Sequence, residues 1–208
     1  MRRSFVLRIA AVALVAFAAP ALAPRAARAD ASDPAAQQIE NFDAALIRAM
    51  KAGKDAGPQG RAKIMGPAVD ATFNLPVMTA FAVGPAWAAA SAEDKSSLIA
   101  AFRKYTVANY AKNFDSYEGQ KIAVDPVVMT RLPDKLVKTT MNGNGATVVL
   151  GYRMRQAGGT WKVIDVLFNG AISQLTTQRS DFSATLQSGG VKALIAKLDA
   201  QTEKLLKP

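Results

Sequence analysis

The spacing of apolar residues changes from a helical to a strand-like period near Gly119 and returns to a helical period toward the C-terminus. Before the change, Ile39, Phe42 and Leu46 recur every three to four residues, which is typical of one helix face. After it, four segments with strand-like composition are joined by short turns, which favour antiparallel pairing of neighbours. The order predicts an α+β fold, with a curved antiparallel sheet of about four strands packed against a layer of helices.

The expected strands cover residues 121–131, 135–142, 146–156 and 160–168. Helices are expected after the Asp33-Pro34 pair, over residues 59–70 and 76–83, after Ser91, over residues 172–187, and from Val191. Asp33 and Ser91 are good helix N-caps, because their side-chain oxygens can accept the first free backbone N–H groups. Ser188-Gly189-Gly190 is expected to end the helix over residues 172–187.

The last strand, residues 160–168, is apolar on both faces although it contains one acid, Asp165. Alternation predicts Trp161, Val163 and Leu167 on one face and Ile164, Val166 and Phe168 on the other. A strand of an antiparallel meander normally has one polar face. Either helices cover both faces or one face lines a pocket. Gly151 in the neighbouring strand and the Ala- and Gly-rich segment 78–90 favour the pocket.

The N-terminus has the pattern of an export signal. Arg2, Arg3 and Arg8 precede a short apolar run, and Ala27-Arg28-Ala29 is a small-residue cleavage site. We expect residues 1–29 to be a cleaved signal peptide of the Sec or twin-arginine route and residues 30–208 to form a single domain. Cleavage lowers the net charge from +10 to +5, because residues 1–29 contain five arginines and no acids. The remaining charge is too weak to predict nucleic-acid binding, but it suits transient contact with an anionic membrane surface.

The chain contains neither cysteine nor histidine. Without cysteine it has no thiolate nucleophile, iron–sulfur cluster or structural zinc site, and without histidine it lacks the usual general base and the commonest transition-metal ligand. These absences exclude the Ser-His-Asp triad, the histidine metalloproteases and the cysteine hydrolases. Carboxylate pairs of the glycosidase kind stay open in principle, although the acids are spread along the chain. We expect no catalytic residues, no metal and no cofactor.

An ordered set of short segments resembles the MlaC family of periplasmic phospholipid-binding proteins. The resemblance spans residues 35 to 200, and no single segment is diagnostic. It rests on Phe73-Asn74-Leu75-Pro76, Gly84-Pro85-Ala86-Trp87, Ser91 followed by Lys95, Gly151-Tyr152-Arg153-Met154, the run from Gly159 to Val166, the run from Asn169 to Ser173, and Arg179-Ser180-Asp181-Phe182. The chain also resembles a hopanoid-associated branch named HpnM. The chain departs from the family pattern at Asn169-Gly170, where the family commonly has Glu-Gly, and at Thr177-Gln178-Arg179, where it has Asn-Tyr-Arg.

The resemblance implies a soluble periplasmic shuttle rather than an enzyme. Such a protein carries a phospholipid, or a hopanoid-type lipid, in a cavity between sheet and helices. Its implied partners are an inner-membrane ABC transporter complex and an outer-membrane lipoprotein complex, which together maintain outer-membrane lipid asymmetry. The departures leave the scaffold unchanged but affect ligand identity and partner recognition.

The expected lipid-binding residues are large apolar and aromatic side chains of the helices and the last two strands. They are Phe81, Trp87, Phe102, Tyr105, Tyr110, Val148, Leu150, Tyr152, Trp161, Val163 and Leu167. For each of them, ordinary core packing is the alternative. Asp165 is expected to be structural and to pair with Arg179 or Arg153, because an unpaired buried carboxylate is costly.

Two other functions are compatible with the residues. One is an enzyme or small-ligand binder of the cone-shaped ketosteroid isomerase-like type, in which Asp165 works with Tyr110 or Tyr152, since a buried acid beside a tyrosine can move protons without histidine. The other is a structural or adaptor protein of the periplasm. A long apolar cavity favours the carrier, whereas a small polar one favours the enzyme.

Overall fold

The computed structural model describes residues 33–143 and 145–207. The expected signal peptide and its cleavage site lie outside these ranges. Within them, no helix combines the length and the apolar character that crossing a membrane requires.

Among the described residues, three of the first five helices begin at a residue whose side chain caps them. In α1 (Pro34–Ala52), the Asp33 carboxylate accepts a hydrogen bond of 2.8 Å from the Ala35 N–H, as its sequence predicts. The Asn74 side chain caps α3 (Leu75–Val83) and Ser91 caps α5 (Ala92–Asn113) in the same way. By contrast, α2 (Gly57–Thr72) has no side-chain cap. A short helix, α4 (Pro85–Ala89), follows Gly84, whose positive φ of 66° ends α3.

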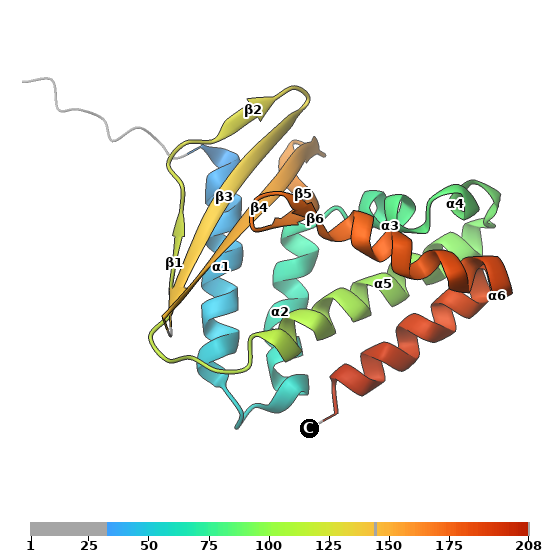
Figure 1. Ribbon diagram of the computed structural model, residues 1–208, viewed down its shortest axis with the longest axis horizontal. Coiled ribbons are helices and arrows are strands. Elements are labelled where there is room, and N and C mark those ends of the chain that lie inside the picture. The colour runs from blue at the N-terminus through green and yellow to red at the C-terminus, as the bar shows by residue number, and fades with distance from the viewer. Residues whose placement is uncertain (1–32, 144, 208) are drawn as a thin grey trace, which may run out of the picture. The chain divides into compact units, whose positions relative to one another are not determined.

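In the part of the chain that the structure describes, six strands form one antiparallel sheet in the order β1-β3-β4-β5-β6, with β2 also paired to β3. The strands are β1 (Lys121–Val124), β2 (Met129–Arg131), β3 (Asp134–Gly143), β4 (Ala146–Ala157), β5 (Thr160–Phe168) and β6 (Ile172–Ser173). The predicted strand 121–131 is therefore divided into β1 and β2, around Pro126. The sheet packed against helices confirms the α+β prediction (Figure 1).

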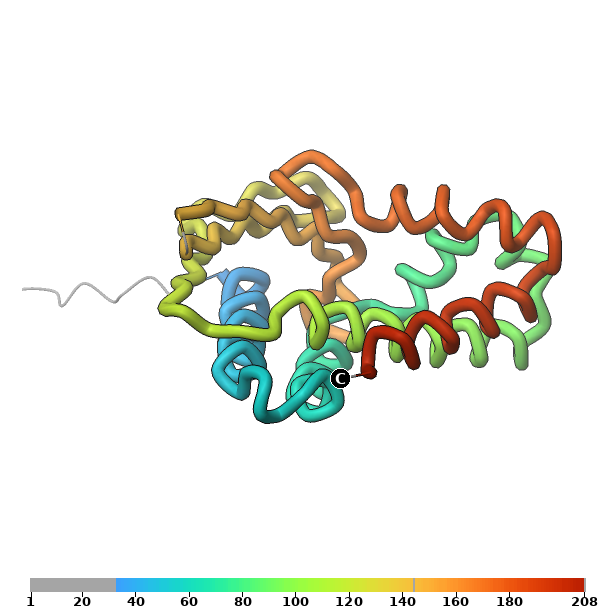
Figure 2. The backbone as a smooth tube through the Cα atoms, turned by 60° about the horizontal axis from the view of Figure 1, so that its bottom comes forward, coloured from blue at the N-terminus to red at the C-terminus, as the bar shows by residue number. Residues whose placement is uncertain are grey.

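The C-terminal helix α6 (Gln174–Leu205) turns back on itself at Gly190, which has φ 64° and ψ −161°. The Ser188-Gly189-Gly190 segment thus marks a kink between two halves. The first half runs beside α3, and the returning half lies beside α5 (Figures 1 and 2). Because α6 follows β6 directly, its first half starts at the edge of the sheet.

A β-bulge in β5 changes which side chains share a face. Arg153 of β4 pairs with Asp165 and Met154 pairs with Val163, so Ile164 is the extra residue. Beyond the bulge the alternation is shifted by one residue, and Val166 pairs with the buried Tyr152 on the helix-covered face. Leu167 therefore lies on the opposite face from Trp161 and Val163. The sequence prediction that these three side chains share one face was wrong for Leu167.

The core lies between the helices and one face of the sheet. Helix α1 packs against β1, β3 and β5, and α2 packs against both α1 and α5. The edge of β5 is covered by the chain after α2, where the Asn74 N–H donates to the Val163 carbonyl at 2.8 Å. The α1-covered face of the sheet supplies the buried side chains Val137, Tyr152, Met154, Val163 and Val166.

Candidate functional site

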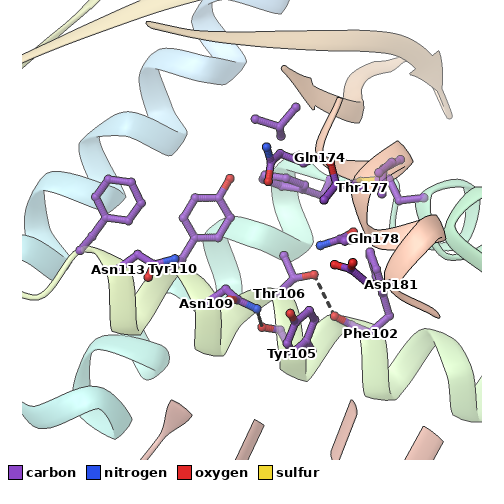
Figure 3. Close-up of a pocket in the computed structure, with 15 residues that line it drawn as sticks. Phe102, Tyr105, Thr106, Asn109, Tyr110, Asn113, Gln174, Thr177, Gln178 and Asp181 are labelled. Carbon is purple, nitrogen blue, oxygen red and sulfur yellow. Dashed lines mark hydrogen bonds between the residues drawn. The ribbon is translucent and has the colours of Figure 1, made fainter. Parts of the chain in front are cut away.

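A pocket of about 260 Å³ lies between α5, the first half of α6 and the end of β5 (Figure 3). It is partly open to solvent. The lining residues are Phe73, Met78, Phe102, Tyr105, Thr106, Asn109, Tyr110, Asn113, Phe114, Val166, Gln174, Leu175, Thr177, Gln178 and Asp181. We call it the helix pocket.

The inner part of the helix pocket is apolar. Its buried members Phe73, Met78, Phe102 and Leu175 come from four different segments of the chain. Thr106, which is also buried, uses its hydroxyl within its own helix, donating to the Phe102 carbonyl at 2.8 Å. One polar atom of the lining, the Oε1 of Gln178, is buried without a hydrogen-bond partner among the described residues, and the rest of the interior suits hydrocarbon.

The rim of the helix pocket is polar. Asn113 of α5 and Gln174, Thr177 and Asp181 of α6 are exposed there. Asn109 also lines the pocket, and its side-chain amide donates to the Tyr105 carbonyl at 2.8 Å. These amides, hydroxyls and one carboxylate can hydrogen-bond a polar group that stays in contact with water.

An aromatic cluster closes the inner end of the helix pocket. The ring centroids of Phe42 and Tyr110, and those of Phe42 and Phe73, are 5.1 Å apart. Tyr152 extends the cluster toward the sheet at 6.3 Å from Phe42. These tilted and edge-on contacts are favourable arrangements for aromatic rings. Tyr110 belongs to both the cluster and the pocket lining.

A buried acid, Asp43 of α1, lies next to this cluster. The residue is 6% exposed, and neither carboxylate oxygen has a hydrogen-bond partner among the described residues. Burial, followed by the nearby Glu40 charge, raises the pKa of Asp43 to about 7. Burial also raises the pKa of Tyr110 and of Tyr152, and the negative charge of Asp43 adds to both shifts.

A second concavity of about 850 Å³, the outer groove, lies on the other face of the sheet. Leu136, Arg153, Asp165 and Leu167 line its floor, and Phe81 of α3 lines its side. Gly151 leaves space on this face for the side chains of its neighbours, because a Cβ at this position would lie 3.2 Å from Leu136 and 3.4 Å from Leu167. The outer groove is more charged than the interior of the helix pocket.

The predicted lipid-binding residues divide between these regions. Phe102, Tyr105 and Tyr110 line the helix pocket. Phe81 and Leu167 line the outer groove. The remaining strand residues lie on the helix-covered face, where Tyr152 and Val163 are fully buried and the other members, Val148, Leu150 and Trp161, are half-buried.

Trp87 lies on α4, outside the lining of both concavities. Its ring is half-buried and the Lys95 ammonium lies 5.7 Å from the ring centroid. This cation–π contact fastens α4 to the first turn of α5. The contact explains Trp87 without a ligand.

The expected ion pair between Asp165 and Arg179 is absent from the structure. Asp165 instead accepts a hydrogen bond of 3.3 Å from the Leu175 N–H, in the first turn of α6. The Arg179 guanidinium lies 5.5 Å from the centroid of the Phe81 ring. Arg153, the other expected partner, binds Asp134 at 2.6 Å. The free N–H groups at a helix N-terminus thus take the place of an arginine.

The acid and the tyrosines of the alternative enzyme are also separated. Asp165 lines the outer groove, whereas Tyr152 is buried on the opposite face of the sheet. The acid whose charge reaches Tyr110 and Tyr152 is Asp43. Sequence reasoning missed Asp43. It falls between Ile39 and Leu46 on an apolar helix stripe, and an acid at such a position is the signal that could have found it.

Sequence reasoning also missed the polar rim of the helix pocket. A signal for it was present in α5, where Thr106, Asn109 and Asn113 follow Phe102 at helical spacing. In α6, Gln174, Gln178 and Asp181 show the same spacing. What no local pattern could indicate is that these two polar stripes face each other.

Comparison with known proteins identifies the family. The family described as MlaC protein matches residues 40–200 of the chain. The fold is similar to that of a phospholipid-binding protein from Ralstonia solanacearum, whose structure was determined in complex with a phospholipid. That match has a TM-score of 0.72 and 22% sequence identity, and it covers 83% of this chain and 99% of the other. The family match spans most of the chain and includes both helices of the pocket, so the chain belongs to the MlaC family.

Proposed function

We propose that the protein is a lipid carrier that binds the acyl chains of a phospholipid in the helix pocket. The observation that carries this proposal is the pocket itself, with its apolar interior and its polar rim between α5 and α6. Acyl chains would enter between the two helices, and the head group would remain at the rim. Membership of the MlaC family and the phospholipid held by the Ralstonia protein of similar fold support this assignment.

The energetics of such a carrier require no catalytic group. Moving an acyl chain out of water gains about 0.8 kcal/mol per methylene, but a bilayer offers the same gain. A carrier therefore needs an apolar slot that nearly matches the membrane, so that lipid can both enter and leave. An apolar interior with few polar contacts meets this need.

The helix pocket must widen to hold its cargo. Its volume of about 260 Å³ is below the range of roughly 300–1,000 Å³ that suits a drug-sized ligand, and a diacyl phospholipid is larger than such a ligand. The first half of α6 is the element that can move, because Gly190 joins it to the rest of the helix in a non-helical conformation. We infer that cargo binding separates this half from α5.

The wider setting follows from the same proposal. We propose export to the periplasm after cleavage near Ala29, and exchange of lipid with an inner-membrane ABC transporter complex and an outer-membrane lipoprotein complex. Contact with the membrane surface would be transient. A hopanoid-type cargo, as in the HpnM branch, remains a prediction.

Blocking the helix pocket tests the proposal. Gln178 is half-buried and lines the pocket from α6, and its side-chain oxygen is buried without a hydrogen-bond partner among the described residues. Gln178→Trp should therefore fill the space and leave the fold intact. We expect native mass spectrometry to detect diacyl lipid copurifying with the wild-type chain and at least tenfold less with Gln178→Trp. The matched control is Gln187→Trp, an exposed position on the same helix. Equal lipid content in the two variants, or a wild-type chain that never takes up phospholipid from vesicles, would contradict the proposal.

A further inference from the structure

Three polar side chains from three different elements come together behind the inner end of the helix pocket. They are Asp43 of α1, Tyr110 of α5 and Tyr152 of β4. Asp43 and Tyr152 are 6% and 0% exposed. Both oxygens of Asp43 lack a hydrogen-bond partner within the described residues, and the Tyr152 hydroxyl makes no hydrogen bond of standard geometry there, although the buried Thr139 side chain lies near it. Buried polar groups are almost always hydrogen-bonded, so an unpartnered set of this kind needs an explanation.

Packing does not require these polar groups. Asp43 occupies a position on the stripe of α1 that otherwise holds Ile39, Phe42 and Leu46, and a leucine there would remove the cost of burying a carboxyl. The Tyr152 ring fills core space, but a phenylalanine ring would fill it equally well. The oxygens are therefore candidates for a role in binding.

The group of three is connected to the helix pocket through Tyr110. The Tyr110 ring lines the pocket, and in Figure 3 it projects from α5 with its hydroxyl directed away from that helix. It also contacts Phe42, the residue next to Asp43, at 5.1 Å between ring centroids. Tyr110 thus lies beside both the pocket and the buried acid, since the charge of Asp43 also reaches its hydroxyl.

We propose that Asp43, Tyr110 and Tyr152 form a binding site for a hydroxyl group at the buried end of an apolar cargo molecule. This inference rests on the proposed carrier function and adds a preference among cargoes. A hydroxyl is both donor and acceptor, so it can donate to an Asp43 oxygen while it accepts from the Tyr152 hydroxyl. An ammonium group can only donate, and a plain hydrocarbon end can do neither.

Two probes that differ only at the buried end test this site. Hexadecanoic acid and 16-hydroxyhexadecanoic acid have the same chain and head group, and the second carries a terminal hydroxyl. Dissociation constants of both are measured on the delipidated full chain. Burying a hydroxyl without a partner is unfavourable by about tenfold or more in affinity. We expect the wild-type chain to bind the hydroxylated acid within threefold of the plain acid.

Substitutions at Asp43 and Tyr152 distinguish recognition of the hydroxyl group from a general change in fatty-acid binding. Asp43→Leu and Tyr152→Phe should each bind hexadecanoic acid normally but bind the hydroxylated acid at least tenfold more weakly. Asp55→Leu is the matched control, because it makes the same change at an exposed turn and should keep the wild-type ratio. Since both test variants remove unpartnered polar atoms, they should fold, and thermal melting checks this.

The outcomes distinguish the site from the carrier function. If the wild-type chain binds plain acid but disfavours the hydroxylated one as strongly as Asp43→Leu does, the hydroxyl site is wrong and the carrier function stands. Internal water molecules alone on Asp43 would give that result. If the wild-type chain binds neither acid and takes up no phospholipid from vesicles, both proposals fail.

Discussion

At the scale of single residues, Asp43 is distinctive because it is an acid buried in an apolar helix face. Its burial beside two tyrosines leaves a carboxyl group without a partner, and the pKa rises to about 7 because the charged form is poorly solvated. The other ionisable groups facing it are Glu40 on the same helix, Tyr110 on α5 and Tyr152 on β4. Since the pKa of each tyrosine is raised, both stay uncharged where Asp43 titrates.

The stability of the protein should therefore fall as pH rises through the titration of Asp43. The folded-state pKa is above the ordinary value of 3.8, so the stabilisation is fully present below pH 3.8 and is lost as pH rises through about 7. The loss is on the order of 4 kcal/mol, at 1.36 kcal/mol per pKa unit. We expect Asp43→Asn to remove this loss, so that the variant exceeds the wild type in stability at pH 8.5 but not at pH 4.

Urea unfolding of both proteins between pH 4 and pH 9 measures this difference. Asp55→Asn, at an exposed position, should follow the wild-type curve. Parallel curves for the wild type and Asp43→Asn would mean that Asp43 keeps an ordinary pKa.

At the scale of elements, the bulge in β5 and the start of α6 are linked. The bulge at Ile164 turns Asp165 and Leu167 toward the outer groove, and this places the Asp165 carboxylate at the first turn of α6. Leu175, which donates the hydrogen bond to Asp165, is buried and lines the helix pocket. Asp165 of β5 thus positions the N-terminal turn of α6, which lines the helix pocket.

Removing the Asp165 carboxylate should destabilise the N-terminal turn of α6 and lower the free energy of unfolding. Asp165→Ala leaves the Leu175 N–H buried without this acceptor, which costs about 1–3 kcal/mol. Asp165→Asn keeps an acceptor oxygen and should cost less than half as much. Chemical unfolding measures both values. Equal losses for the two variants would assign the effect to the charge of Asp165 rather than to its hydrogen bond.

At the scale of the whole molecule, the described residues divide into a part that should stay fixed and a part that should respond to cargo. The fixed part is the core between α1, α2 and the sheet, which is closed by the aromatic cluster. The responsive part is the first half of α6 with α3, which is joined to the fixed part through Asn74 and Gly190. Functional motions draw on regions with fewer buried contacts.

Hydrogen exchange should report this division. We expect amides of residues 174–189 and 102–113 to exchange more slowly when the protein is loaded with phospholipid, because bound acyl chains contact both helices and suppress their local opening. Amides of α1 should not change. In Gln178→Trp the same lipid should produce no slowing. Equal slowing in α1 and α6 would place the cargo elsewhere in the molecule.

Much of the fold could be predicted from the sequence, but only part of the site could. The caps at Asp33 and Ser91 and the turns between strands are local, so they marked the ends of elements correctly. Phe102, Tyr105 and Tyr110 were predicted as ligand-facing and do line the helix pocket. Leu167 was predicted as ligand-facing too, but it lines the outer groove instead, because the bulge that reverses its direction depends on the pairing of β5 with β4.

The sequence by itself determined the order and type of the elements, because apolar period, capping residues and turn residues act over a few positions of the chain. It also excluded histidine and cysteine chemistry, since composition does not depend on the fold. Only the tertiary structure decided which acid is buried without a partner, which face Leu167 occupies, and that the polar stripes of α5 and α6 share one pocket. These features depend on contacts between residues far apart in the chain, which no local pattern contains.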